Sequence, residues 1–289
     1  MAVSLDPDHL RQWLGKSQTS HDTANPWPVH AMTATLAGDG APEGPALGAG
    51  DALPPLWHWL YFLEARPAPE LGPDGHAARG GFLPPVPLPR RMWAGGRVDF
   101  PGTVPIGAAL RKESEIVSVE AKPGKSGALV FVTVRHSVFV GEGAPPVVEE
   151  HDIVYREAAK PGASPAPTRP APESTAWRRT IRPDPVLLFR FSALTFNGHR
   201  IHYDQPYTTG VEGYPGLIVH GPLQAILLLE LCRRHAPSRR VARFVYRALS
   251  PVFDTATFTV NGTPSTESAE LWIADHAGAL AMSGTAHFA

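Results

Sequence analysis

The sequence predicts an α+β protein made of two similar halves, each an antiparallel sheet wrapped around a central helix. Three observations support this: the length of 289 residues, a proline-rich segment near the middle, and an apolar helix followed by strands on either side of it. At roughly 150 residues per domain, the length suits two domains. We therefore expect an N-terminal domain at 1–157, a linker at 158–175 and a C-terminal domain at 176–289.

The middle segment, 158–175, reads AAKPGASPAPTRPAPEST and holds five prolines. Proline removes backbone amide donors and biases the chain toward extended polyproline II, so we expect a semi-stiff linker. A ligand for an SH3-type domain is the alternative interpretation of this segment.

In the first half, two prolines precede the apolar and aromatic stretch 56–65. Because proline is favoured at a helix start, this stretch predicts a short helix. A loop rich in proline and glycine is expected over 72–102. Alternating β-branched and polar residues then predict an antiparallel meander. We expect its strands at 108–120, 128–140 and 147–156.

In the second half, the stretch 223–234 is apolar almost all round, which predicts a buried helix. Its last turn carries two arginines, which interact favourably with the helix dipole. A sheet curled around such a helix would bury the helix and one face of the sheet. We expect the strands of that sheet at 240–249, 256–262, 269–275 and 281–288.

Composition limits the classes of partner. Lys plus Arg is 26 and Asp plus Glu is 27, so the net charge of −1 requires neither nucleic acid nor an anionic membrane. No apolar run approaches the roughly 20 residues that span a bilayer, and no targeting segment is visible. The single Cys232 excludes an intrachain disulfide and fits a reducing compartment. We expect a cytoplasmic protein that uses no membrane.

Two segments of the second half carry chemistry. The first, FSALTFNGHRIHYDQ at 191–205, places Asn197, His199, His202 and Asp204 within eight residues. Histidine can transfer protons near neutral pH without a large change in pKa.

The second segment, GLIVHGPLQ at 216–224, leads into the predicted buried helix. Gly221 then lies at a helix start, where a backbone N–H without an intrahelical partner can polarise a carbonyl oxygen or stabilise an oxyanion.

These segments resemble the MaoC-like hot-dog-fold acyl-thioester hydratases and dehydratases. The motif of that family runs aromatic-Ser-x-x-Thr/Ser-Gly-Asp-x-Asn-Pro-Ile-His and continues in a Pro/Gly-Ile-Val-His-Gly helix start. The resemblance implies a double hot-dog fold. It also implies the addition of water to the α,β double bond of an acyl-CoA thioester, or its removal. The matching residues here are Phe191, Ser192, Thr195, Ile201, His202, Ile218, Val219, His220 and Gly221.

The sequence departs from the family motif at four positions. Phe196 stands where the family has glycine, and Asn197 stands where it has the catalytic aspartate. His199 and Arg200 replace Asn-Pro. This variant, together with LPRRMWAGGRVDF at 88–100, resembles the branch that contains mesaconyl-C4-CoA and itaconyl-CoA hydratases and mitochondrial-type hydroxyacyl-thioester dehydratases.

The resemblance implies a distribution of catalytic roles. His202 would carry most of the proton transfer, and the N–H of Gly221 would stabilise the enolate-like thioester oxygen. A neutral amide cannot exchange protons at accessible pH, so Asn197 can only orient water or a neighbour. Asp204 either orients His202 or supplies the missing acid; in an extended segment both would project from one face. The first domain is expected to be non-catalytic and to cover the substrate tunnel.

For substrate binding we expect Arg200 to hold an acyl carboxylate, because arginine can bind a carboxylate through two parallel hydrogen bonds. Arg90 and Arg91 are further candidates for the carboxylate or the CoA phosphates, as is Arg97. His220 is expected beside the substrate, and Phe196 is expected to narrow the pocket. A C5 dicarboxylic acyl group, itaconyl or mesaconyl, is the preferred substrate.

No metal site is expected, because the His and acidic residues lack zinc-binding spacing. No cofactor is expected either, since coenzyme A is part of the substrate. A homodimer is one assembly to test. Three alternative functions stay open: a fatty-acid-type 3-hydroxyacyl-thioester dehydratase, a non-catalytic acyl-thioester-binding protein and a thioesterase.

Overall fold

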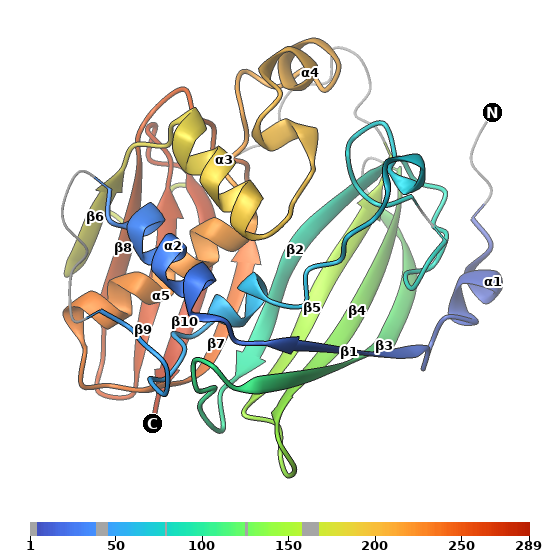
Figure 1. Cartoon of the computed structure of the whole chain (residues 1–289). Coiled ribbons are helices and arrows are strands. Elements are labelled where there is room, and N and C mark those ends of the chain that lie inside the picture. The colour runs from blue at the N-terminus through green and yellow to red at the C-terminus, as the bar shows by residue number, and fades with distance from the viewer. Residues whose placement is uncertain (1–4, 39–45, 79, 125–126, 158–167) are drawn as a thin grey trace.

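The computed structural model describes residues 5–38, 46–78, 80–124, 127–157 and 168–289. These residues form one continuous antiparallel sheet in the order β1-β3-β4-β5-β2-β7-β10-β9-β8-β6 (Figure 1). The strands are β1 Ser17–Thr23, β2 Arg90–Asp99, β3 Ala109–Gly124, β4 Gly127–Val140, β5 Val147–Arg156, β6 Trp177–Ile181, β7 Val241–Ala248, β8 Phe258–Pro264, β9 Ser268–Ala274 and β10 Leu280–Phe288. The helices are α1 Pro7–Arg11, α2 Pro26–Leu36, α3 Pro185–Leu194, α4 Gln205–Gly210 and α5 Gly221–His235, with the 3₁₀ turns η1 Trp57–Leu60, η2 Ala68–Glu70 and η3 Arg200–His202.

The two halves join along β2 and β7, which pair over Gly95–Asp99 and Arg243–Arg247. The two backbones approach closely here: a Cβ on Gly95 would lie 2.4 Å from the backbone oxygen of Tyr246. The guanidinium of Arg243 lies 2.9 Å from the carboxylate of Asp99 across the same seam. One sheet therefore continues from the first half into the second.

Helix α5 is the centre of the largest apolar core. Its residues Leu223 to Cys232 are all buried, as the apolar sequence predicts. Helices α2, α3 and α5 lie on one face of the second-half strands (Figure 1), and α2 packs against α3. Each Leu or Ile buried here contributes about 1.5–3 kcal/mol relative to an exposed side chain. A first-half helix thus covers part of the second half.

The structure confirms the α+β class, the helix predicted at 223–234 and the seven predicted strands, with boundaries shifted by a few residues. The prediction of a helix at 56–65 was wrong, because only the single 3₁₀ turn η1 forms there. Leu56 and Phe62, on either side of η1, have φ values of 70° and 59°, in the left-handed region that a right-handed helix cannot continue through. The first half therefore has one helical turn where a central helix was expected.

Other elements were not predicted from the sequence. Strand β2 occupies the second part of the expected loop at 72–102, and α2, β6 and α3 lie in segments without an expected element. Of the expected linker, 158–167 lies outside the described residues. In the remainder, Pro170 forms a bridge with Ala279 just before β10, and the Thr175 hydroxyl donates to the backbone oxygen of Gly262 in β8.

A buried carboxylate fastens η1 to the first-half sheet. Glu149 of β5 is 4% exposed. It accepts hydrogen bonds of 2.9 Å from His58 Nε2 and Trp59 Nε1. Burial by itself would raise the pKa of Glu149, but the hydrogen bond and charge of His58 outweigh it and lower the pKa to about 2. The ionised carboxylate is therefore the form that the fold stabilises.

Replacing Glu149 with alanine should lower the free energy of unfolding by about 3–5 kcal/mol, because His58 and Trp59 lose a buried partner. The folded-state pKa lies below the ordinary value, so this stabilisation is present above pH 4.5 and is lost as pH falls toward 2. Urea unfolding at several pH values measures both effects. Glu113→Ala, which removes an exposed carboxylate on β3, is the control and should cost less than about 1 kcal/mol. Equal losses in the two variants would contradict the prediction.

Candidate active site

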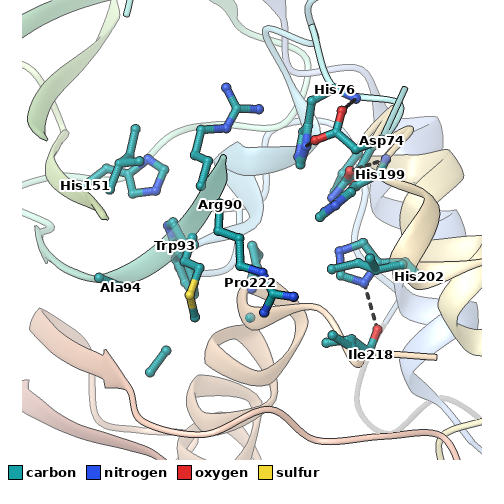
Figure 2. Close-up of a pocket in the computed structure, with 18 of the residues that line it drawn as sticks. Asp74, His76, Arg90, Trp93, Ala94, His151, His199, His202, Ile218 and Pro222 are labelled. Atoms are coloured by element: carbon teal, nitrogen blue, oxygen red, sulfur yellow. Dashed lines mark hydrogen bonds and ion pairs between the residues drawn. The ribbon is translucent and has the colours of Figure 1, made fainter. Parts of the chain in front are cut away.

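A cavity of about 2820 Å³ opens between the two halves of the chain. Its walls come from the start of α5, the turn η3, the first residues of β2 and the loop around residue 75. Figure 2 shows His202 and Pro222 on the second-half side and Trp93, His151 and His76 on the first-half side. The cavity is larger than most small-molecule sites, so it has room for an extended thioester.

His202 lines this cavity and is 7% exposed. Its Nδ1 lies 2.7 Å from the backbone oxygen of Ile218 (Figure 2). Since a carbonyl can only accept, Nδ1 carries the hydrogen and Nε2 keeps its lone pair. Burial lowers the pKa of His202 to about 4. At neutral pH the ring is therefore uncharged, which is the state that a general base requires.

His220 fixes the plane of the His202 ring. The two rings are stacked, with centroids 3.6 Å apart and an interplanar angle of 18°. His220 is completely buried, and its Nε2 lies 2.8 Å from Ser192 Oγ. The prediction that His220 contacts substrate was wrong, because it lies behind His202 and does not line the cavity.

Gly221 begins α5 and lines the cavity, as predicted. A Cβ at this position would lie 2.6 Å from a ring carbon of Trp93, so the first-half strand β2 requires glycine here. Pro222 follows and also lines the cavity. The N–H groups of this first turn have no intrahelical partner and carry the positive end of the helix dipole.

Asn197 and Phe196 lie in the turn between α3 and η3, and both line the cavity. The side-chain oxygen of Asn197 accepts a hydrogen bond of 3.0 Å from the backbone N–H of His199, which leaves the amide nitrogen available to donate. Phe196 has φ 48° and is 60% exposed. Phe196 therefore stands at the rim of the cavity, and any narrowing of the substrate pocket by its side chain would act at that rim.

Two predicted site residues lie outside the cavity. Arg200 pairs with Asp204 at 2.8 Å and its guanidinium lies 3.9 Å from the ring centroid of Tyr207. Asp204 also caps α4 by accepting from the N–H of Tyr207 at 3.1 Å. The predicted roles of Arg200 as the carboxylate anchor and Asp204 as partner of His202 were therefore wrong. Residues 200–202 form a 3₁₀ turn, so His202 and Asp204 do not share one face as they would in a strand.

The remaining arginine candidates differ in their partners. Arg90 lines the cavity but lies 3.6 Å from Glu212 and over the ring of Tyr214. Arg97 pairs with Glu150 and Asp152 and does not line the cavity. Arg91 lines the cavity. It forms no ion pair with any carboxylate of the described residues, which makes it the candidate most suited to an external anion.

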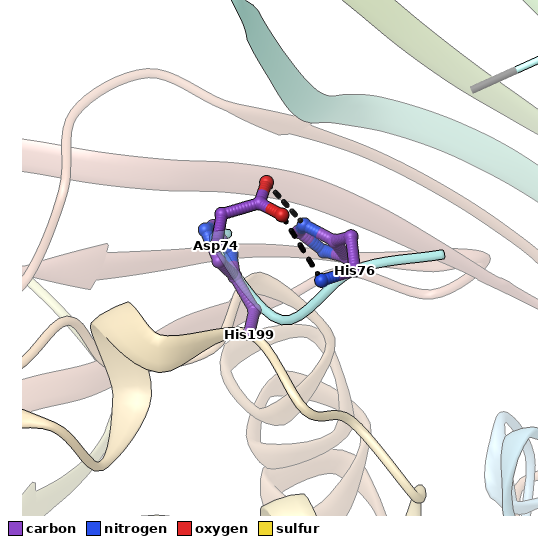
Figure 3. Close-up of side chains that lie close together, drawn as sticks. All are labelled: Asp74, His76 and His199. Carbon is purple, nitrogen blue, oxygen red and sulfur yellow. Dashed lines mark hydrogen bonds and ion pairs between the residues drawn. The ribbon is translucent and has the colours of Figure 1, made fainter. Parts of the chain in front are cut away.

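The first half contributes a group that the sequence interpretation missed. Asp74 and His76 come from the loop before β2 and line the cavity together with His199. Figure 3 shows that the three side chains lie close together. Asp74 accepts from both the ring Nδ1 and the backbone N–H of His76, each at 3.1 Å, and the His76 and His199 rings are 4.0 Å apart. One donor atom from each of the three side chains lies within 4.8 Å of the others, a spacing compatible with a metal ion. The carboxylate is instead engaged by His76, as in a hydrogen-bonded dyad.

The short spacing of Asp74 and His76 in a glycine-rich loop was the available sequence signal. It did not indicate that this loop reaches the motif of the other half.

Within the described residues, no helix is both long and apolar enough to cross a membrane.

Comparison with known proteins places these features in a family. Residues 56–254 match the model of the family described as hydroxyacyl-thioester dehydratase type 2. The chain is 46% identical over 273 residues to a protein of Chloroflexus aurantiacus named mesaconyl-C4-CoA hydratase, covering 94% of this chain and 95% of that one. It is 28% identical to the mitochondrial hydroxyacyl-thioester dehydratase type 2 of Schizosaccharomyces pombe, covering 85% and 89%.

Solved structures share the fold. A MaoC-like dehydratase from Phytophthora capsici aligns with a TM-score of 0.71 at 13% identity, covering 99% of this chain and 98% of that one. A Mycobacterium tuberculosis protein described as a double hotdog fold aligns with a TM-score of 0.56 at 14% identity, covering 96% of each chain. These structures confirm the predicted double hot-dog fold class.

Proposed function

Because this chain belongs to the hydroxyacyl-thioester dehydratase type 2 family, we propose that it hydrates a small enoyl-CoA with a C5 dicarboxylic acyl group, mesaconyl-C4-CoA or itaconyl-CoA. The chain is a hydro-lyase of the hydratase and dehydratase type. The observation that carries the proposal is the neutral His202, with its unprotonated Nε2 at the cavity and the start of α5 beside it.

The residues at the cavity suggest how water is added. Nε2 of His202 takes a proton from water as the oxygen attacks Cβ of the enoyl group. The amide nitrogen of Asn197 donates to that water and orients it. Negative charge then develops on the thioester oxygen, where the N–H of Gly221 at the start of α5 stabilises it.

The acyl carboxylate is assigned to the neighbourhood of Arg91. This side chain lines the cavity, whereas Arg90, Arg97 and Arg200 already pair with carboxylates of the chain. If a neutral acyl tail were bound, the charge of a cavity-lining arginine would have no partner. A dicarboxylic acyl group is therefore favoured. The relative from Chloroflexus aurantiacus is named for such a substrate.

A fatty-acid-type 3-hydroxyacyl-thioester dehydratase is the second candidate. The cavity of about 2820 Å³ has room for a longer acyl chain. The relative from Schizosaccharomyces pombe carries the name of that activity. The two candidates differ in the acyl group and share the same proton transfers at His202.

Steady-state kinetics with purified protein distinguishes the candidates. The substrates are mesaconyl-C4-CoA, itaconyl-CoA, crotonyl-CoA and a C10–C16 enoyl-CoA, and the signal is loss of enoyl-thioester absorbance. We expect kcat/KM to be about 10²-fold or more higher for a dicarboxylic substrate than for crotonyl-CoA. A preference for long neutral chains would move the chain to the second candidate. Release of free thiol without loss of the double bond would indicate a thioesterase.

A further inference from the structure

We propose that the first half supplies the second acid/base of the reaction, with His76, held by Asp74, exchanging the proton at Cα of the acyl group. This inference rests on the proposed function, in which His202 handles the proton of the attacking water. The reaction needs a second group that exchanges a proton. Asn197 stands where the family motif has an aspartate, and its side-chain amide cannot give or take a proton. Within the proposal, the first half is part of the catalytic machinery as well as a cover.

The loop that carries His76 is fixed against the motif turn of the second half. The backbone N–H of Arg200 donates to the backbone oxygen of Asp74 at 2.9 Å. The guanidinium of Arg200 also donates to the backbone oxygen of Pro73 at 3.1 Å. Gly75 has φ 86°, and a Cβ there would lie 2.0 Å from the backbone oxygen of Gly198. Two glycines therefore allow the backbones of the two halves to touch at the site.

The distances place His76 and His202 on neighbouring walls of one cavity. The ring of His199 lies between them, 4.0 Å from His76 and 5.5 Å from His202, measured between ring centroids. All three side chains line the cavity, with His76 above and His202 below in Figure 2. An acyl group lying against His199 could therefore present its Cβ to one histidine and its Cα to the other.

The two histidines have different surroundings. The hydrogen bond from His76 keeps the pKa of Asp74 far below its ordinary range, so the carboxylate stays ionised. Because an ionised carboxylate can only accept, the ring Nδ1 of His76 donates to Asp74 at 3.1 Å, which orients the His76 ring. His202 is held neutral by burial and accepts. One histidine is thus oriented by a carboxylate and the other is kept neutral by burial, and the two different settings suit two different proton transfers.

The steps balance for hydration. An O–H bond of water breaks as its oxygen bonds to Cβ, and the proton goes to Nε2 of His202. The π electrons move to the thioester oxygen, forming an enolate next to the N–H of Gly221. The enolate then takes a proton from His76, which forms the new C–H bond at Cα. Solvent returns the proton of His202 to His76, and the net change is the addition of one water.

The test separates Cα chemistry from water addition. A saturated acyl-CoA with the same carboxylate has no leaving group at Cβ, so incorporation of deuterium at Cα in D2O reports the Cα step alone. We expect His76→Gln to reduce this exchange and kcat for hydration by about 10²–10³-fold, with KM changed less than about threefold. His202→Gln should retain the Cα exchange while losing hydration. His21→Gln, an exposed histidine of β1, is the matched control and should change neither rate.

Asp74→Asn provides a second variant if His76→Gln fails to fold. It keeps an oxygen for the backbone N–H of His76 but removes the charge, so exchange should fall by at least about tenfold. Full Cα exchange in either folded variant would overturn the inference, as would loss of wild-type exchange on dialysis against a chelator with recovery on adding Zn²⁺. Wild-type protein that hydrates none of the enoyl-CoA panel would overturn the proposed function instead.

Discussion

Replacing His202 with alanine should reduce kcat for hydration by about 10²–10⁴-fold, the usual contribution of a positioned general base. The expected loss follows from three features of the ring. Its Nδ1 is fixed by the backbone oxygen of Ile218, its plane is fixed by stacking on His220, and its Nε2 is left to accept a proton. Steady-state kinetics with the preferred enoyl-CoA, on protein shown to be folded by circular dichroism, measures the effect.

The pH dependence of kcat/KM for the wild-type enzyme should also reflect the lowered pKa of His202. Burial lowers the pKa of His202 to about 4, so the neutral ring persists well below pH 6.5. Protonation at lower pH removes the base, and the acidic limb of kcat/KM should therefore fall near pH 4. Near-normal turnover in folded His202→Ala would remove this residue from the mechanism.

The second-half site could be predicted because its parts are close in sequence. The segment 191–205 and the start of α5 are separated by about twenty residues and meet through one short connection. A helix start needs only local signals, here Gly221 followed by proline and an apolar run. The sequence could point to His202 and Gly221 for that reason, and both line the cavity.

The first-half contribution could not be found in this way. Asp74 and His76 lie more than a hundred residues from the motif, and they reach it only because Gly75 and Gly198 bring two backbones into contact. The error at Asp204 has a related cause. The spacing of two residues from His202 was interpreted as a strand, whereas Arg200 draws Asp204 into an ion pair and a helix cap. Short-range patterns do not determine which carboxylate an arginine meets across the fold.

Replacing Arg91 with methionine should lower kcat/KM for the dicarboxylic substrate by about 10²–10³-fold, the usual cost of removing one partner of a buried charge pair. Turnover of crotonyl-CoA should be retained. Arg91 lines the cavity and lacks a carboxylate partner among the described residues. His151 lines the same cavity, and its buried Nε2 also has no hydrogen-bond partner among the described residues. Burial, with a smaller contribution from the charge of Arg91, lowers the pKa of His151.

Arg90→Met is the matched control, since it removes an equal charge from the preceding position of β2. Arg90 already meets Glu212 at 3.6 Å, so its loss should leave the ratio of kcat/KM between dicarboxylic and neutral substrates within about threefold of wild type. Arg91→Lys should fall between wild type and Arg91→Met, because lysine keeps the charge but cannot bind a carboxylate through two parallel hydrogen bonds. A ratio unchanged in Arg91→Met but lost in Arg90→Met would place the acyl carboxylate on the Glu212 side of β2. A wild-type ratio near one would mean that neither arginine selects the acyl group.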